Sequence, residues 1–180
     1  MDKKIIIING KGKSGKDTFV KMVGKYIKTQ NYSSVELIRE VAKHLGYDEN
    51  RKNEKDRKFL SDLKMLSTKY NDAPFNDMIL MILNFLYSKD NINELLFIHV
   101  REPNEIQRLM NYAKESNICM TTLLIEREEL DDVVYGNLAD DNVDLYNYDY
   151  KISNNGTLED LEDNAMAYLM HILGDDLNLR

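Results

Sequence analysis

The amino-terminal part of the chain carries a β-branched run, a glycine-rich loop and the start of an amphipathic helix in direct succession. Four isoleucines, Ile5–Ile8, precede the loop Asn9–Gly15, and the helix opens with Lys16–Thr18. A continuous apolar run is typical of a strand that is buried on both faces of a parallel sheet. A loop of this kind points its backbone N–H groups inward, with the positive end of the helix dipole behind them. The pattern therefore predicts a phosphate-binding loop, and the flanking strand and helix disfavour a plain surface turn.

The residues of this loop have separate tasks in holding a polyphosphate. Glycines allow positive φ and let the backbone approach phosphate oxygens closely. Lys16 is expected to reach over the loop to the β- and γ-phosphates, which makes it the first candidate catalytic residue. The expected cofactors are ATP and Mg²⁺. The predicted nucleotide-binding residues of the loop are Gly10, Gly12, Lys13, Ser14, Gly15, Lys16, Asp17 and Thr18.

Asp17 stands where this motif ordinarily has Ser or Thr, whose hydroxyl binds Mg²⁺. A carboxylate is a hard oxygen donor, so Asp17 is the candidate metal ligand and Thr18 a donor to the α-phosphate. The alternative is that Asp17 only occupies the first turn of the helix, where the dipole favours an acidic residue. The sequence leaves both interpretations open.

Length, charge and composition narrow the class of protein. The chain has 180 residues, and we expect one domain of ordinary size over 1–180. A net charge of −7 disfavours general attraction to nucleic acid or to an anionic membrane. No apolar stretch reaches bilayer-spanning length, and the single cysteine, Cys119, excludes an intrachain disulfide framework. These features predict a cytoplasmic protein with small-molecule nucleotide partners, and they leave its oligomeric state undetermined.

Strand and helix patterns alternate along the chain. Strands are expected at 3–9, 33–35, 95–100, 121–125 and 149–153. Helices are expected at 16–29, 36–45, from 59, from 74, at 103–115 and after Thr157. Alternation implies right-handed crossovers, so we expect an α/β fold of the P-loop NTPase type, with about five mostly parallel strands between two helix layers. Tyr146, Tyr148 and Tyr150 alternate as residues of an edge strand do.

Ligands bind at the carboxyl ends of the strands in such a sheet, which places two arginines near the phosphate loop. Arg101 follows the strand at 95–100, and Arg127 follows the strand at 121–125. Because the planar donor fork of arginine suits phosphate, Arg101 is a candidate for either phosphate and Arg127 for a clamp on the transferring group. With Lys16, these arginines are the predicted catalytic residues.

Each of these two arginines also has a structural alternative. Arg101 is close in sequence to Glu102 and Glu105, with which a salt bridge would be structural. Arg127 is followed by two glutamates, so a surface ion pair is an equal alternative to a clamp. The acidic stretch 126–147 is predicted to be a lid-like or surface segment.

Five segments, spread in order along the chain, resemble one family of enzymes. They are Ser14–Asp17, 34–42, 57–63, Val100–Glu105 and 150–158. The loop ends in Ser-Gly-Lys-Asp and the fourth segment is Val-Arg-Glu-Pro-Asn-Glu, similar to the Val-Arg-Phe-Pro-Asn-Glu of that family. The family is the P-loop kinases of nucleoside monophosphates. The resemblance is strongest to the phage-type deoxynucleoside monophosphate kinases, and more distant to phosphomevalonate kinase and dephospho-coenzyme A kinase.

The resemblance implies ATP- and Mg²⁺-dependent phosphoryl transfer to a (deoxy)nucleoside monophosphate. It implies that a helical insert over 34–90 binds the acceptor and that Asn155 and Gly156 pack near adenine. Substrate-binding candidates are Arg39, Arg57 and Arg101, although for Arg39 and Arg57 a solvated helix face is an equal alternative.

Two departures from the family pattern keep other functions open. His99 stands where the family usually has an aspartate that helps to place Mg²⁺, and Leu37 replaces a usual proline. The alternatives are a kinase of another small phosphorylated acceptor, of the phosphomevalonate or dephospho-coenzyme A type, and a catalytically inactive nucleotide-binding protein.

Overall fold

The computed structural model describes residues 3–51, 53–130 and 142–174. The chain divides into two compact units. We call Met1–Asn31 with Ile92–Arg180 the sheet unit, and Tyr32–Asn91 the helical unit. Of the lid-like stretch predicted at 126–147, residues 131–141 lie outside the described part. Within the described ranges, no helix is long and apolar enough to cross a membrane.

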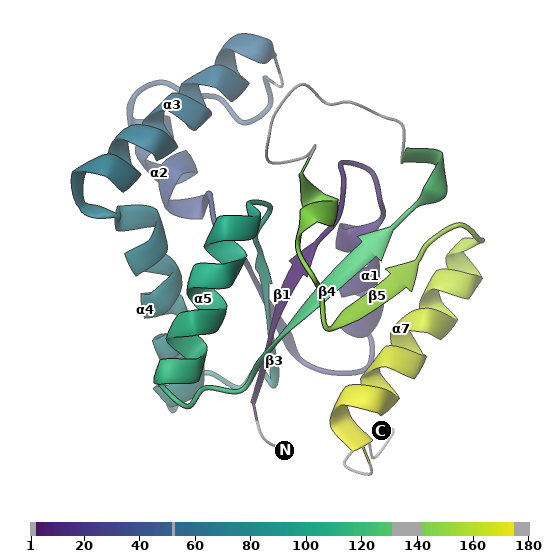
Figure 1. Ribbon diagram of the computed structural model, residues 1–180. Coiled ribbons are helices and arrows are strands. Elements are labelled where there is room, and N and C mark those ends of the chain that lie inside the picture. Colours follow the sequence, from purple (N-terminus) through teal and green to yellow (C-terminus); the bar gives the residue numbers. More distant parts are fainter. Residues whose placement is uncertain (1–2, 52, 131–141, 175–180) are drawn as a thin grey trace. The chain divides into compact units, whose positions relative to one another are not determined.

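The sheet has five strands in the order β2-β3-β1-β4-β5 (Figure 1). β1 pairs in parallel with β3 and β4, and β4 pairs in parallel with β5. Because β1 has a strand on each side and helices over both faces, its isoleucines Ile5–Ile8 are at most 1% exposed. The expected three-layer α/β fold is confirmed. The strand bounds are β1 Lys4–Asn9, β2 Thr29–Ser33, β3 Leu95–His99, β4 Met120–Glu126 and β5 Tyr150–Ser153.

Helices of the sheet unit cover both faces of the sheet. α1 (Lys16–Val23) and α7 (Leu158–Leu173) pack on one face, and α5 (Pro103–Glu115) lies on the other (Figure 1). On the first face, Ile6 and Ile8 of β1 join a buried cluster with residues of both helices. Short 3₁₀ turns occur at η1 (Glu128–Leu130) and η2 (Val143–Leu145).

α7 begins with a capping box, and the prediction that Thr157 caps this helix is confirmed. The Thr157 Oγ1 accepts from the Asp160 backbone N–H, and the Asp160 carboxylate accepts from the Thr157 backbone. The Thr157 N–H and hydroxyl both donate to the Asp160 carboxylate, and they hold its pKa below the ordinary value. The box therefore contributes stability at neutral pH, and this contribution is lost as acidification passes the lowered pKa.

The helical unit contains α2 (Glu36–His44), α3 (Glu54–Asn71) and α4 (Ala73–Tyr87). The Asn53 side chain caps α3 by accepting from the Asp56 N–H at 2.8 Å. Asp72 ends α3 in the left-handed conformation, with φ 57°, and α4 begins directly after it. The unit spans nearly the same residues as the insert expected at 34–90.

Four predicted details of secondary structure are wrong. The third helix begins at Glu54 instead of 59, because the Asn53 side chain caps it there. The first helix ends at Val23 instead of 29, because the chain turns at Gly24 and its next residues lead into β2. The second strand is Thr29–Ser33 instead of 33–35. Tyr146 and Tyr148 precede β5 and form no edge-strand ladder with Tyr150. Tyr148 is instead 6% exposed, with its ring edge-on to that of Tyr146 at 5.1 Å.

A buried threonine fixes the approach of the chain to β5. Thr122, 1% exposed, donates from both its N–H and its hydroxyl to the Asp149 carboxylate at 2.8 Å. Its hydroxyl oxygen also accepts from the Asp149 N–H at 2.9 Å. β5 begins at the next residue, so this pair holds the start of the strand beside β4.

We predict that Thr122→Val lowers the free energy of unfolding by roughly 1–3 kcal/mol, because it removes the two hydrogen bonds that the buried hydroxyl makes with the Asp149 carboxylate and N–H. Urea unfolding followed by circular dichroism measures the loss. Thr68→Val is the matched control, since the Thr68 hydroxyl bonds the Lys64 carbonyl of its own helix at 2.9 Å. Equal losses in the two variants would contradict this account.

Candidate phosphate site

The loop after β1 has the conformation of an anion cradle. Gly10 and Gly15 have φ of 156° and 94°, and Lys13 takes φ 70° although it carries a side chain. A Cβ on Gly10 would lie 2.6 Å from the Ile125 carbonyl oxygen, and a Cβ on Gly15 would overlap the Asn154 amide. The two glycines are therefore required by both conformation and space.

Lys16 lies at the helix end of this loop and folds back over it. It is 8% exposed, and its Nζ donates to the Gly10 carbonyl oxygen at 3.3 Å. The Ser14 Oγ is buried and, among the described residues, has no hydrogen-bond partner. A buried hydroxyl without a partner is costly unless a ligand satisfies it. An ammonium group and an unpaired hydroxyl in one backbone cradle fit a phosphate group.

The segment after β5 holds the loop in place. The Asn154 Nδ2 donates to the Ser14 carbonyl oxygen at 2.9 Å, and the Asn154 N–H donates to the Glu126 carbonyl oxygen at 2.8 Å. Asn155 and Gly156, predicted near adenine, are exposed, and the Asn155 Oδ1 accepts from the Glu128 N–H. The loop contact is thus made by Asn154. Asn154 could have been found from the sequence, because it is an asparagine directly after a predicted strand.

Asn9 and Tyr148 complete the site, and neither is among the site residues predicted from the sequence. Asn9, 0% exposed, ends β1 with its side chain bonded to the Gly10 N–H, the Arg101 carbonyl and the Tyr148 hydroxyl. Burial raises the pKa of the Tyr148 phenol. Asn9 could have been found from the sequence, because it is a polar residue at the end of an isoleucine run. For Tyr148 the sequence holds no signal beyond the residue type.

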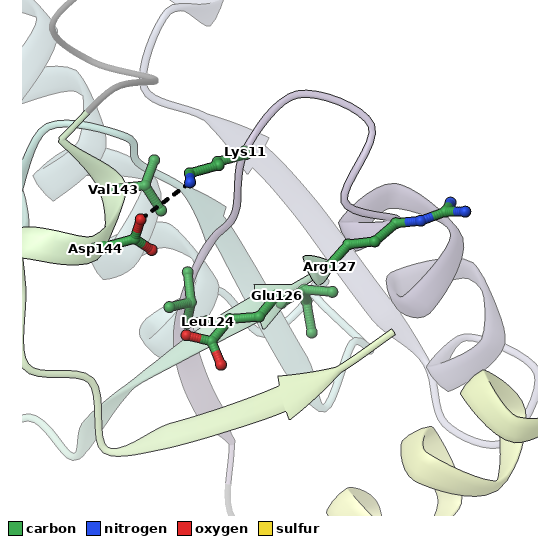
Figure 2. Close-up of a pocket in the computed structure, with 7 residues that line it drawn as sticks. Lys11, Leu124, Glu126, Arg127, Val143 and Asp144 are labelled. Atoms are coloured by element: carbon green, nitrogen blue, oxygen red, sulfur yellow. Dashed lines mark ion pairs between the residues drawn. The ribbon is translucent and has the colours of Figure 1, made fainter. Parts of the chain in front are cut away.

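Arg101 and Arg127 follow the carboxyl ends of β3 and β4, the strands on either side of β1, as predicted. Arg101 is exposed two residues beyond β3, and its carbonyl accepts from the Asn9 Nδ2 at 3.1 Å. Arg127 follows β4 directly and forms an ion pair with Glu129 at 2.7 Å. Figure 2 shows its side chain pointing away from Lys11 and Asp144, which pair with each other at 3.2 Å. Arg127 thus lies at the predicted end of the strand. In this conformation its side chain makes the surface ion pair that the sequence analysis gave as the alternative to a clamp.

Asp17 lies in the first turn of α1, with its side chain 78% exposed. The His99 Nδ1 is 3.8 Å from the Asp17 Oδ1, and the His99 Nε2 is 3.4 Å from the Asn31 Oδ1. Among the described residues, no cluster of three His, Cys, Asp or Glu side chains could hold a metal ion. Mg²⁺ ordinarily takes one or two carboxylates together with substrate phosphates, so a single exposed Asp17 fits it.

The acceptor candidates belong to the helical unit. Arg39 on α2 is partly exposed and lies 3.5 Å from the Glu36 carboxylate. Arg57 is exposed on the first turns of α3. Both lie on solvated helix faces, and their role in substrate binding stays a prediction.

Two cavities in the sheet unit differ in size and position. The one in Figure 2, between Lys11, Arg127 and Asp144, has a volume of about 10 Å³, room for a single water molecule. The other has a volume of about 200 Å³ and lies at the amino ends of β1, β4 and β5. Ligands of parallel sheets bind at the opposite, carboxyl edge. The site is therefore defined by the phosphate loop and its partners.

Comparison with known proteins shows the fold. No protein-family model and no curated protein matches the sequence. The tunicamycin resistance protein of Deinococcus radiodurans matches 92% of this chain and 95% of its own, at 12% identity and a TM-score of 0.57. The protein TT1252 of Thermus thermophilus matches 97% and 100%, at 17% identity and a TM-score of 0.51. The APS kinase CysC of Mycobacterium tuberculosis, solved with AMPPNP and APS, matches 93% of this chain and 98% of its own, at 11% identity. Its TM-score of 0.45 is too low to support a structural argument.

We predict that Gly15→Ala destabilises the protein more than Gly46→Ala does. Both glycines have positive φ, 94° and 88°, so each alanine meets a left-handed conformation that costs about 1–2 kcal/mol. The space around Gly46 is open, whereas a Cβ on Gly15 would overlap Asn154. Urea unfolding measures both, and Gly15→Ala combined with Asn154→Ala should recover part of the loss. Equal losses in the two glycine variants would refute the steric requirement.

Proposed function

We propose that this chain is an ATP-dependent phosphotransferase whose acceptor is a nucleoside monophosphate. The observation that carries the proposal is the cradle at the end of β1, where Lys16 folds over a loop built on left-handed Gly10 and Gly15. Cradles of this form bind phosphate through backbone N–H groups and a lysine. The resemblance of the chain to nucleoside monophosphate kinases supports this choice of acceptor.

The donor triphosphate is bound by the loop in this proposal. The Lys16 ammonium exchanges the Gly10 carbonyl for the β- and γ-phosphates. The Ser14 hydroxyl, unpaired among the residues that the structure describes, gains a partner. Phosphoryl transfer needs little covalent work from the protein. It needs the two substrates aligned and the spreading negative charge neutralised.

Mg²⁺ bound with the triphosphate would supply positive charge that neutralises the phosphates. Asp17 is the residue proposed to hold it, directly or through water, with Thr18 donating to the α-phosphate. The exposure of the Asp17 carboxylate leaves it accessible to a hydrated ion.

Arginines complete the proposed site. Arg101 binds a phosphate of either substrate, and Arg39 and Arg57 bind the acceptor phosphate. Arg127 exchanges Glu129 for the transferring group. An exposed ion pair contributes only about 0–1 kcal/mol, so little stability is lost when Arg127 leaves it.

The central experiment screens ligands by thermal shift and then measures turnover. ATP with Mg²⁺ is combined with ribo- and deoxyribonucleoside monophosphates, phosphomevalonate and dephospho-coenzyme A. A ligand that binds the folded state raises Tm as its concentration exceeds Kd. We expect stabilisation by ATP and by a nucleoside monophosphate, followed by formation of ADP. Transfer to either other acceptor would replace the proposed substrate class, and ATP binding without any transfer would indicate an inactive nucleotide-binding protein.

In the same assay, Lys16→Ala should weaken ATP binding at least tenfold, because a hydrogen bond from a charged group contributes about 1.5–3 kcal/mol. The control is Lys25→Ala, since Lys25 pairs with Glu162 on the surface, with its side chain 55% exposed. Unchanged affinity in the Lys16 variant would remove the phosphate loop from the site.

Arg101→Ala should lose roughly 10³-fold in kcat, the lower end of the range for an arginine that stabilises the transferring phosphoryl group. Its Tm should stay close to that of the wild type, because the Arg101 side chain is exposed. Arg108→Ala, at an exposed position on α5, is the matched control. Equal kcat values for the two variants would exclude Arg101 from the reaction.

A further inference from the structure

We infer that Asn9 and Tyr148 are positioning residues of the phosphoryl transfer, which fix the start of the phosphate loop and the backbone of Arg101 in one hydrogen-bonded frame. This inference rests on the proposed function and adds to it two residues that do not touch substrate.

Asn9 uses its whole side-chain amide to join three segments. Its Oδ1 accepts from the Gly10 N–H at 2.8 Å. Its Nδ2 donates to the Arg101 carbonyl oxygen at 3.1 Å and to the Tyr148 hydroxyl at 2.7 Å. Because the side chain is fully buried, water cannot replace these partners, and the geometry of the three segments depends on this one amide.

Tyr148 sets the orientation of that amide. Its hydroxyl accepts from Asn9 and donates to the Val143 carbonyl oxygen at 2.9 Å. Tyr148 and Val143 are 6% and 1% exposed, so the hydrogen bonds lie in the interior of the sheet unit. The raised pKa of the buried phenol keeps it protonated, and therefore able to donate, at physiological pH.

The same segment contacts the phosphate loop at a second point. Asp144, next to Val143, pairs with Lys11 at 3.2 Å, and the Lys11 side chain is 12% exposed. Residues 143–148 therefore hold the loop at two residues. They hold Gly10 indirectly, since Tyr148 bonds Asn9 and Asn9 bonds the Gly10 N–H, and they hold Lys11 directly through Asp144. Figure 2 shows Lys11 and Asp144 reaching toward each other from the two segments.

This frame has a catalytic consequence. Asn9 bonds the carbonyl of Arg101, which lies where the chain leaves the sheet. Asn9 also bonds the N–H of Gly10, and the carbonyl of Gly10 accepts from Lys16. A displacement of about 1 Å in such groups can reduce the rate of transfer up to 10²-fold. Removing the Tyr148 hydroxyl should therefore reduce transfer through Arg101, although Tyr148 itself contacts no phosphate.

The test is a double-mutant cycle on kcat with Tyr148→Phe and Arg101→Ala, measured by a radiometric assay with ATP and the acceptor identified above. We expect Tyr148→Phe to lose about tenfold in kcat in the wild-type background. In the Arg101→Ala background, the same change should lose clearly less than tenfold, since the part of its effect that passes through Arg101 is already absent. Tyr146→Phe is the matched control, because Tyr146 stacks edge-on against Tyr148 but is outside the hydrogen-bonded frame, and it should leave kcat unchanged.

The outcomes separate the inference from the function on which it rests. A wild-type protein that neither binds AMPPNP nor transfers phosphate overturns the proposed function. An active wild type in which Tyr148→Phe equals Tyr146→Phe overturns only the inference. Losses that simply multiply across the cycle also overturn it, since Tyr148 would then act independently of Arg101. Tyr148→Phe removes one oxygen, and a circular dichroism melt confirms that the variant is folded under assay conditions.

Discussion

β1 lies between β3 and β4 and hydrogen-bonds in parallel to both, so three strands end at the same edge of the sheet. The phosphate loop follows β1, the central one of these strands. Arg101 follows β3, and Arg127 follows β4. The helices on both faces exclude water from β1, which makes it a rigid base for the loop. The loop needs such a base, because Gly10, Lys13 and Gly15 hold backbone conformations that an isolated peptide would rarely keep.

The sequence predicts this arrangement well where the signal is local. The isoleucine run, the spacing of Gly10, Gly15 and Lys16 and the Thr157 cap each depend on residues close together in the chain. The end of the first helix was less clear, because Ile27 continues the apolar spacing past Gly24 and remains buried although the helix has ended.

Contacts between distant parts of the chain are what sequence reasoning did not find. Asn9 and Tyr148 are 139 residues apart, and Asn154 and Ser14 are 140 apart. A side chain's type states what it can donate or accept, but only the register of the strands decides which groups meet. Arg127 is the opposite case, because its partner Glu129 is two residues away and the sequence already offered this ion pair as the alternative to a clamp.

β5 closes one side of the sheet with only four residues, and within the described part of the chain no strand lies beyond its outer edge. An open strand edge invites pairing with other chains, and short edges with lysine side chains discourage it. Lys151 stands in the middle of β5, with its ammonium 3.4 Å from the Glu126 carboxylate of β4. A second molecule that added a strand here would gain few backbone hydrogen bonds and would desolvate this charged pair. The border of the sheet is thereby protected against intermolecular aggregation during refolding.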